Sequence, residues 1–440
     1  MKKSEIIAKL REYVKNDLSP TAVERNLISD IYSAFQDLFS RNCIQIGSFP
    51  RYTAICPIHD LDILYIVGDW EDEINNSNEL LNHVKNQIES DFDNPVKHQI
   101  EISLQTHSVT VLFTERGNEV FSIDIVPGYI VGKNGFGQDL YIVPEITTLH
   151  HGTARNEFYR SLLNEKKEMR WIVSDPRGYI EIAKSVNKAN SDFRKTVKFI
   201  KAWKNNCKSK DEEFKLKSFH IEQIVTNFFK NNSSADIFDG IFNFFITLPN
   251  IIEKPQIIDR ANNSRFIDDY IDELSPEQKN KIIQARDCLL KELEEITPTL
   301  KIEELIEGCF YERSSIMEQF MFDFSIPTFI DDEYSFEIFG KLEERRGFPP
   351  NYLPFNGKID IDRKIYFDIK KRNSQVHSYY WKVKNDNGCP EPRGDITISH
   401  SKNVPENTKY GGTHYVECYA VLDNVCVAKA RQYVVLEYYS

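Results

Sequence analysis

Residues 46–67 read IGSFPRYTAICPIHDLDILYIV, and this stretch decides the fold. It places a small Gly47-Ser48 turn before two carboxylates, Asp60 and Asp62, which are separated by one residue. The second carboxylate opens the apolar run ILYIV, which predicts a buried β-strand. On a strand both carboxylates point to the same face, roughly 6–7 Å apart at the backbone. Two charges this close favour a bound divalent cation, and the turn could present substrate phosphates to that cation.

A third carboxylate lies in a later apolar stretch, VFSIDIV at 120–126. Asp124 is the only acid in that alternation and shares a face with Ser122 and Val126. Burying an acid is costly unless it is paired or bound to a metal, so this residue needs a partner. Asp-x-Asp alone is a common surface pattern and is weak evidence for a functional site. Gly-Ser alone is even weaker evidence. The combination of the three features predicts a metal-dependent site that transfers nucleotidyl groups.

The composition limits the function. The chain has 440 residues, 41% hydrophobic and 28% charged, which is typical of two or three globular domains. No apolar run approaches the roughly 18 residues of a membrane helix, and the N-terminus lacks an apolar secretory segment. The net charge of −12 disfavours long nucleic acid as a substrate. Eight cysteines without a C-x-x-C pair indicate reduced thiols rather than a disulfide framework, so we expect a cytoplasmic protein.

The hydrophobic period changes along the chain. Residues 1 to about 40 and about 178–330 have helical periodicity, whereas strand patterns lie between these segments and again near the C-terminus. Ser275 and Pro276 predict the start of a charged helix. The predicted class is α+β, with an N-terminal helix, a sheet core, a helical second lobe and a small C-terminal β-rich domain. The predicted parts are 1–175, 176–325, a proline- and glycine-rich linker 326–355, and 356–440.

These residues resemble a known superfamily. Gly47-Ser48, Asp60-x-Asp62 and Asp124 match the polymerase-β-like nucleotidyltransferases, which implies that type of sheet core. The chain is more closely similar to the CD-NTases, the bacterial relatives of cyclic GMP-AMP synthase and oligoadenylate synthase. The similarity covers about residues 30–300 and includes RYTAI at 51–55, SIDIVP at 122–127, KxxKxWK at 198–204, SFHIE at 218–222 and NNSRF at 262–266.

The C-terminal motifs form a shorter and less specific match. WKVKN at 381–385, RGDI at 393–396 and ECYA at 417–420 resemble a sensor-like β domain attached to some of these enzymes. No zinc-ribbon insertion of the animal DNA-sensing enzyme is visible in the sequence. Activation by duplex DNA through that insertion is therefore not implied.

The resemblance implies a two-metal active site. Asp60, Asp62 and Asp124 would be the catalytic residues and would bind two Mg²⁺ ions, with Mn²⁺ as an alternative. Asp60 and Asp62 would hold both ions, and Asp124 would hold the ion nearer the acceptor hydroxyl and assist its deprotonation. Gly47 and Ser48 would form the nucleotide-binding turn, and the Ser48 hydroxyl and backbone N–H would contact the donor phosphates.

The helical half is expected to cover the nucleotide. Lys198 and Lys201 lie on one helix face, opposite the apolar stripe of Phe193, Val197 and Ile200. Either ammonium group could reach the β and γ phosphates, and a solvated lysine face is the competing interpretation. The sequence does not choose between the two lysines.

Three further residues are candidates for nucleotide binding. Ser218 is placed to cap a helix, and the resemblance adds a contact with the triphosphate. Phe219 would then stack on a base, although simple core packing is an equal alternative. Arg51 is a weaker candidate, as a phosphate contact or as a brace for the acidic cluster.

The expected function is synthesis of a cyclic di- or tri-nucleotide second messenger from ATP and other NTPs, for antiphage defence. A separate effector protein would read the product, and a regulatory protein or ligand would bind the C-terminal β domain. Three alternatives stay open. An enzyme of the same fold could add nucleotides to RNA ends or to a protein hydroxyl, the chain could be a non-catalytic nucleotide sensor, or the β domain could be a scaffold that recruits partners.

Overall fold

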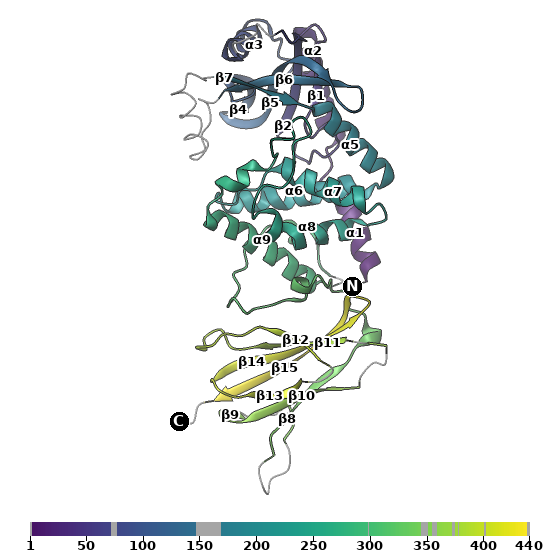
Figure 1. The fold of residues 1–440 in the computed structure, drawn as a ribbon, viewed down its shortest axis with the longest axis vertical. Coiled ribbons are helices and arrows are strands. Elements are labelled where there is room, and N and C mark those ends of the chain that lie inside the picture. The colour runs from purple at the N-terminus through teal and green to yellow at the C-terminus, as the bar shows by residue number, and fades with distance from the viewer. Residues whose placement is uncertain are drawn as a thin grey trace. The chain divides into compact units, whose positions relative to one another are not determined.

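The computed structural model describes residues 2–71, 77–146, 169–297, 299–344, 351–353, 359–371, 375–376, 378–399 and 402–437 (Figure 1). The chain divides into two compact units. One contains Leu10–Ile282, and the other contains Ile283–Ser440 together with Met1–Lys9. None of the helices in these ranges is long and apolar enough to cross a membrane.

A mixed sheet forms the first half of the Leu10–Ile282 unit. Its main path is β1-β2-β5-β4-β3, and β6 and β7 extend it from β5. Only β2 and β5 run parallel to each other among the paired strands described in this sheet. The strands are β1 (Cys43–Ile46), β2 (Asp60–Asp69), β3 (Gln99–Leu104), β4 (Val109–Glu115), β5 (Asn118–Lys133), β6 (Asp139–Ile146) and β7 (Met169–Ser174).

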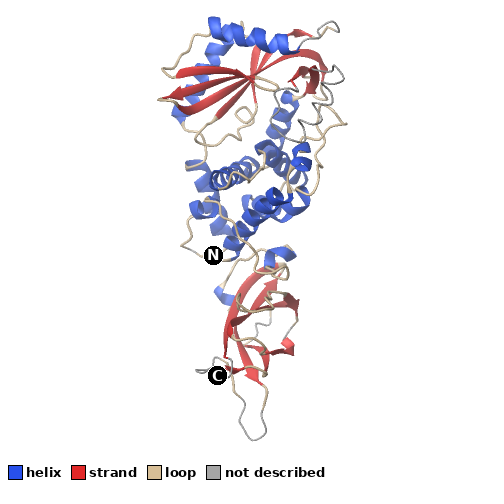
Figure 2. Cartoon of the chain, turned by 90° about the vertical axis from the view of Figure 1, so that its left-hand side faces the viewer, coloured by secondary structure: helices blue, strands red, loops and turns tan. Residues whose placement is uncertain are grey.

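Two helices pack on this sheet, α2 (Ala22–Leu38) and α3 (Ser77–Asp91), as Figure 2 shows. Ile31 and Phe35 of α2 and Val84 of α3 share one apolar core with Leu61 and Ile63 of β2. Thr21 caps α2, because its side chain accepts from the Glu24 N–H and the Glu24 carboxylate accepts from the Thr21 N–H. The apolar face of β2 is therefore covered, and its acidic residues lie on the opposite face.

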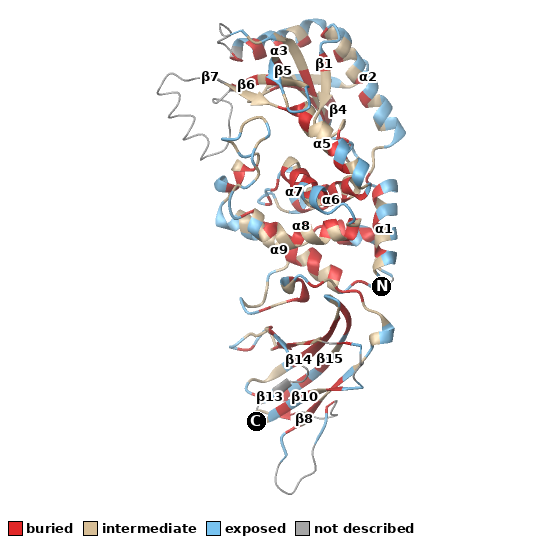
Figure 3. Cartoon of the chain, turned by 45° about the vertical axis from the view of Figure 1, so that its right-hand side comes forward, coloured by how far each residue is buried: buried red, intermediate tan, exposed pale blue. Residues whose placement is uncertain are grey.

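The second half of this unit is helical. Its core includes Trp203, which is fully buried and lies edge-on to Phe214 and Phe245. The buried faces of α6, α7 and α8 are visible in Figure 3. The helices are α5 (Pro176–Ala189), α6 (Asp192–Lys210), α7 (Ser218–Asn231), α8 (Ile237–Ile251) and the 3₁₀ helix η2 (Asp269–Glu273). The next helix, α9 (Pro276–Glu294), begins in this unit and ends in the other.

The other unit contains two sheets that share one apolar core. One sheet has the order β13-β10-β8, and the second has β12-β11-β14-β15-β9. Phe367 of the first sheet and Trp381 of the second lie in the same buried cluster. The strands are β8 (Glu337–Leu342), β9 (Ile359–Asp360), β10 (Lys364–Lys370), β11 (Ser378–Lys384), β12 (Ile396–Ile398), β13 (Lys402–Asn407), β14 (Gly412–Leu422) and β15 (Val425–Glu437).

Short helices complete the described elements: α1 (Lys3–Asn16), α10 (Ile302–Ile306), η3 (Met321–Phe324) and η4 (Asp332–Tyr334). Asp423 and Asn424 connect β14 to β15 with φ values of 50° and 61°, which Asp and Asn tolerate better than most residues. Ser275 begins α9, since its hydroxyl accepts from the Gln278 N–H at 3.1 Å.

The predicted α+β class is confirmed, as are the N-terminal helix, the helical second lobe and the β-rich C-terminal region. The three boundaries between the four predicted parts stay predictions. One expectation was wrong, because Cys288 and Cys309 form a disulfide rather than two free thiols. Their Cα atoms lie 5.8 Å apart, and the spacing of 21 residues carries no sequence signal for this pairing.

Candidate active site

The register of two parallel strands brings the three predicted carboxylates together. Asp62 of β2 lies opposite Asp124 of β5, and Asp60 lies opposite Ser122. The intervening side chains on both strands are buried, with Leu61 only 1% exposed. The alternation of a β-strand therefore presents three carboxylates on one face while their neighbours fill the core.

Asp62 and Asp124 lie in an environment that disfavours their negative charge. Burial, followed by the charges of Asp60 and Asp124, raises the pKa of Asp62 to about 7. Burial also raises the pKa of Asp124, against hydrogen bonds from Thr110 and Ser108. Such a cluster is relieved by a cation, and oxygen-only ligands suit a hard divalent ion. The three aspartates therefore supply oxygen ligands of the kind that a hard divalent ion prefers.

The predicted Gly47 turn follows β1 and lies against this cluster. Ile46 pairs with Asp62 across β1 and β2. Gly47 has a φ of +73°, and a Cβ at this position would lie 1.8 Å from Asp62 Oδ2. The adjacent Ser48 carbonyl accepts from the Thr53 N–H at 3.0 Å, which closes the turn. Only glycine allows the turn backbone to approach the carboxylate this closely.

We expect Gly47→Ala to lower any metal-dependent activity by about 10²-fold, because Asp62 must move away from the new methyl group. Steady-state kinetics with the purified variant measures this loss. Gly117→Ala is the matched control: its φ is +79°, but nothing lies within 4 Å of the added Cβ. Equal losses of activity in both variants would contradict a specific role for the close approach at Gly47.

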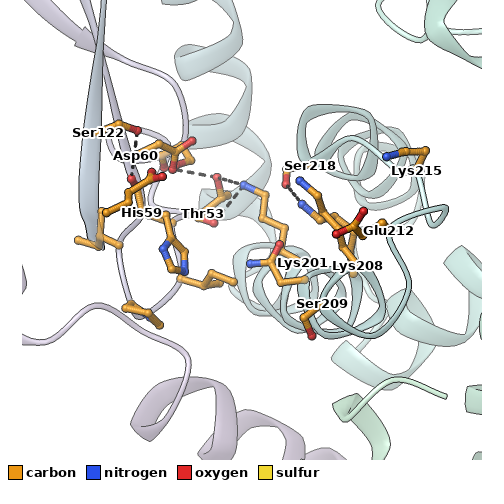
Figure 4. A pocket seen from close by; sticks show the side chains of 18 residues that line it. Thr53, His59, Asp60, Ser122, Lys201, Lys208, Ser209, Glu212, Lys215 and Ser218 are labelled. Carbon is orange, nitrogen blue, oxygen red and sulfur yellow. Dashed lines mark hydrogen bonds between the residues drawn. The ribbon is translucent and has the colours of Figure 1, made fainter. Parts of the chain in front are cut away.

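A cavity of about 780 Å³ lies beside the carboxylates (Figure 4). Its sheet side includes Ser48, Asp60 and Ser122, and its helical side includes Ser218. Four lysines also line it: Lys201, Lys204, Lys208 and Lys215. Of the three aspartates Asp60 alone lines the cavity, and Glu212 lies among the lysines. The lining thus combines a carboxylate of the sheet with several ammonium groups of the helical half, a charge pattern that suits a metal-bound triphosphate.

The two predicted lysines have different surroundings. Lys201 is buried, and its Nζ lies 3.3 Å from Glu222 and donates to the Thr53 carbonyl at 3.2 Å. Lys198 donates to Ser19 Oγ at 3.0 Å and does not line the cavity. Lys201 is therefore the one of the two that borders the cavity.

Lys204 was missed by the sequence interpretation. Its Nζ donates to Ser218 Oγ at 3.0 Å, and both residues line the cavity. Burial, followed by the charges of Lys208 and Lys201, lowers the pKa of Lys204 to about 8. A phosphate beside this ammonium would favour its charged form. The signal was available, because Lys204 lies three residues after Lys201 on the same helix face.

Arg51 and Phe219 lie behind the cavity rather than on its lining. Arg51 is buried and donates to Glu222, and its guanidinium lies 5.3 Å from the centre of the Phe219 ring. Phe219 also meets Tyr179 edge-on, with ring centres 5.0 Å apart. In this arrangement Arg51 braces the turn residues, and the half-buried Phe219 packs against Arg51 and Tyr179.

Residues 315–437 match the family model described as the adenylyl/guanylyl and SMODS C-terminal sensor domain. A probable cyclic nucleotide synthase of Bacillus cereus strain VD146 is 25% identical over 236 residues, which cover 47% of this chain and 62% of that relative. The chain thus spans less than two thirds of the length of this curated relative.

Two solved structures show a distant likeness in fold. Escherichia coli MS115-1 CdnC with ATP is 18% identical, with a TM-score of 0.49 over 70% of this chain and 98% of that one. The cyclic dinucleotide synthase CdnE of Elizabethkingia meningoseptica, solved with GTP and a nucleotide analogue, is 14% identical, with a TM-score of 0.42 over 65% of this chain and 98% of that one. Similarity at this level says nothing about activity.

The sensor-domain match and the cyclic nucleotide synthase relative agree with the motifs in the sequence. Residues 315–437 therefore match a C-terminal sensor domain, and the chain is similar to a probable cyclic nucleotide synthase.

Proposed function

We propose that the protein is a magnesium-dependent nucleotidyltransferase that makes a cyclic di- or tri-nucleotide from ATP and other NTPs. One observation carries the proposal: Asp60, Asp62 and Asp124 share one face of paired strands, beside a cavity lined by lysines. The relative named a probable cyclic nucleotide synthase supports the cyclic product. By the same resemblance, the product would signal to a separate effector in antiphage defence.

The proposed site residues would have separate roles in the reaction. Asp60, Asp62 and Asp124 would hold two metal ions, which when bound supply positive charge to the donor phosphates and the acceptor oxygen. Lys201, Lys204 and the Ser218 hydroxyl would orient the triphosphate from the helical side. Asp124 would accept the proton of the acceptor hydroxyl, and the Gly47-Ser48 turn would bind the donor phosphates through its backbone.

The decisive experiment incubates the purified protein with the four NTPs and Mg²⁺ and analyses the products by mass spectrometry. We expect small nucleotides that resist phosphatase and that are absent from the Asp60→Asn/Asp62→Asn variant. Labelled protein or extended RNA without a small product would instead identify a different acceptor.

Calorimetry of ATP binding distinguishes an enzyme that is inactive without an activator from a protein that does not use ATP. We expect ATP to bind in the presence of Mg²⁺ and to bind more weakly with EDTA, even if synthesis needs an activator. Absence of Mg²⁺-dependent ATP binding would reject both the synthase and the nucleotide-sensor interpretations.

A further inference from the structure

A second cavity, of about 510 Å³, lies entirely within the unit that contains the sensor domain. Residues of β11, β14 and β15 form one side, and the end of α9 and residues 311–320 contribute the rest. An adjoining cavity shares five of its lining residues. None of the proposed catalytic residues lines the cavity of about 510 Å³.

Lys382 is the most unusual residue of this cavity. It lies on β11 and is only 2% exposed, and it lines the cavity. Its Nζ lies 3.9 Å from the centre of the Phe320 ring. It makes no hydrogen bond or ion pair with any residue that the structure describes. A buried ammonium without a hydrogen-bonding anion costs stability, so a partner that comes from solution would be favourable.

The nearby carboxylates are already engaged. Glu318 accepts from Tyr311 Oη at 3.1 Å and from the Ser314 N–H at 2.7 Å, and its other oxygen lies 3.5 Å from Lys384 Nζ. Glu417 accepts from Tyr419 Oη at 2.7 Å and pairs with Arg431. These internal bonds leave neither carboxylate hydrogen-bonded to Lys382. Burial lowers the pKa of Lys382, and the charges of Glu417, Glu318 and Glu294 only partly oppose this.

The other acidic groups of the lining are poorly placed to neutralise the charge of Lys382. Asp386 accepts from the N–H groups of Gly388 and Thr413 at 2.9 and 3.0 Å. Glu294 accepts from the Phe322 N–H at 2.8 Å, and burial raises its pKa to about 7. Glu295 is exposed.

Two further lysines of the lining have no ion pair with a described residue. Lys291 lies 4.5 Å from the centre of the Tyr311 ring, and Lys429 is exposed. The groups of this cavity that are free to bind a ligand are therefore mainly ammonium groups. They favour an anion, and phosphate offers several acceptor oxygens to separate lysines.

We infer that this cavity binds a small phosphorylated organic molecule, with Lys382 as its central contact. The volume of about 510 Å³ leaves room for an organic group beyond the phosphate, within the usual range of small-molecule sites. Tyr311, Phe320 and Tyr415 supply apolar surface for that group. This inference goes beyond the proposed synthase activity and does not depend on it.

Titration calorimetry of the full chain in EDTA tests the inference with three probes: inorganic phosphate, AMP and ribose 5-phosphate. We expect at least one organic phosphate to bind more tightly than inorganic phosphate. Binding of inorganic phosphate with equal affinity would contradict the organic part of the proposal. Absence of binding by all three probes would overturn it.

Lys382→Met keeps the length and the apolar stem of the side chain and removes its charge. We expect the Kd of the bound probe to rise at least tenfold, while thermal unfolding shows a variant as stable as the wild type. Lys370→Met is the matched control, because Lys370 is an exposed lysine on β10 outside the cavity.

Lys429→Met provides a second variant that cannot disturb the core, since this residue is exposed. It should weaken binding of the same probe by a smaller factor than Lys382→Met. Unchanged affinity in both the Lys382 and the Lys429 variants would place the probe elsewhere and overturn the inference.

Discussion

Asp62→Asn is expected to reduce nucleotidyl transfer by at least about 10²-fold without loss of folding stability. The substitution keeps the shape of the side chain and removes one of three neighbouring charges. Because burial and the charges of Asp60 and Asp124 disfavour its ionised form, Asn should be tolerated at least as well in the metal-free protein. Activity is measured with the NTP assay, and stability is measured by thermal unfolding in EDTA.

Asp69→Asn is the control on the same strand. Asp69 is exposed at the other end of β2, away from the carboxylate cluster. It should keep full activity and unchanged stability. The addition of Mg²⁺ or Mn²⁺ should raise the unfolding temperature of the wild type and of Asp69→Asn, and should have less effect on Asp62→Asn. An equal metal-induced shift in all three proteins would argue against metal binding by Asp62.

The parts of the site that could be predicted are those that strand geometry controls. Asp60 and Asp62 were predicted to share a face because side chains alternate along a strand, and Asp124 was predicted to complete the site from a later apolar strand. The pairing of β2 with β5 brings them together, as Asp62 opposite Asp124 shows. Gly47 could be recognised as a turn residue, but its close approach to Asp62 depends on the pairing of β1 with β2.

Other features depend on contacts between distant parts of the chain. Lys198 and Lys201 are equivalent in sequence, and only the packing of α6 directs one to Ser19 and the other toward Thr53. The pairing of Cys288 with Cys309 likewise requires the chain to return to α9. Periodicity contains no information about such meetings, because it describes one element at a time.

The second large effect, a loss of folding stability, is expected when Glu222 is replaced. This residue of α7 is fully buried and accepts from Thr53 Oγ1 at 2.8 Å, and it also pairs with Arg51 and Lys201. Burial opposes its ionisation, but the charges of Arg51 and Lys201 outweigh burial and hold its pKa below the usual value. The stabilisation is therefore present above the pKa of the unfolded state and is lost as the pH falls through the lower folded value.

Glu222→Ala should destabilise the protein by about 3–5 kcal/mol, because it leaves two buried cations without their shared anion. Denaturant unfolding with a probe in the Leu10–Ile282 unit measures the loss. Glu181→Ala removes a glutamate from a surface pair with Lys184 and should change stability by less than about 0.5 kcal/mol. If both variants unfolded at the same denaturant concentration, Glu222 would not stabilise the network.

A double-mutant cycle separates two contributions to the stability loss: removal of the Glu222 charge and the cavity that alanine creates. Lys201→Met alone removes one cation and leaves Glu222 paired with Arg51, so we expect a smaller loss than in Glu222→Ala. In the Lys201→Met background, Glu222→Ala leaves one unpaired buried cation instead of two, and its cost should fall. An unchanged cost would mean that Lys201 and Glu222 are not coupled. A reduced cost would show that Lys201 of α6 is coupled to Glu222, which also accepts from Arg51 and Thr53 after the Gly47-Ser48 turn.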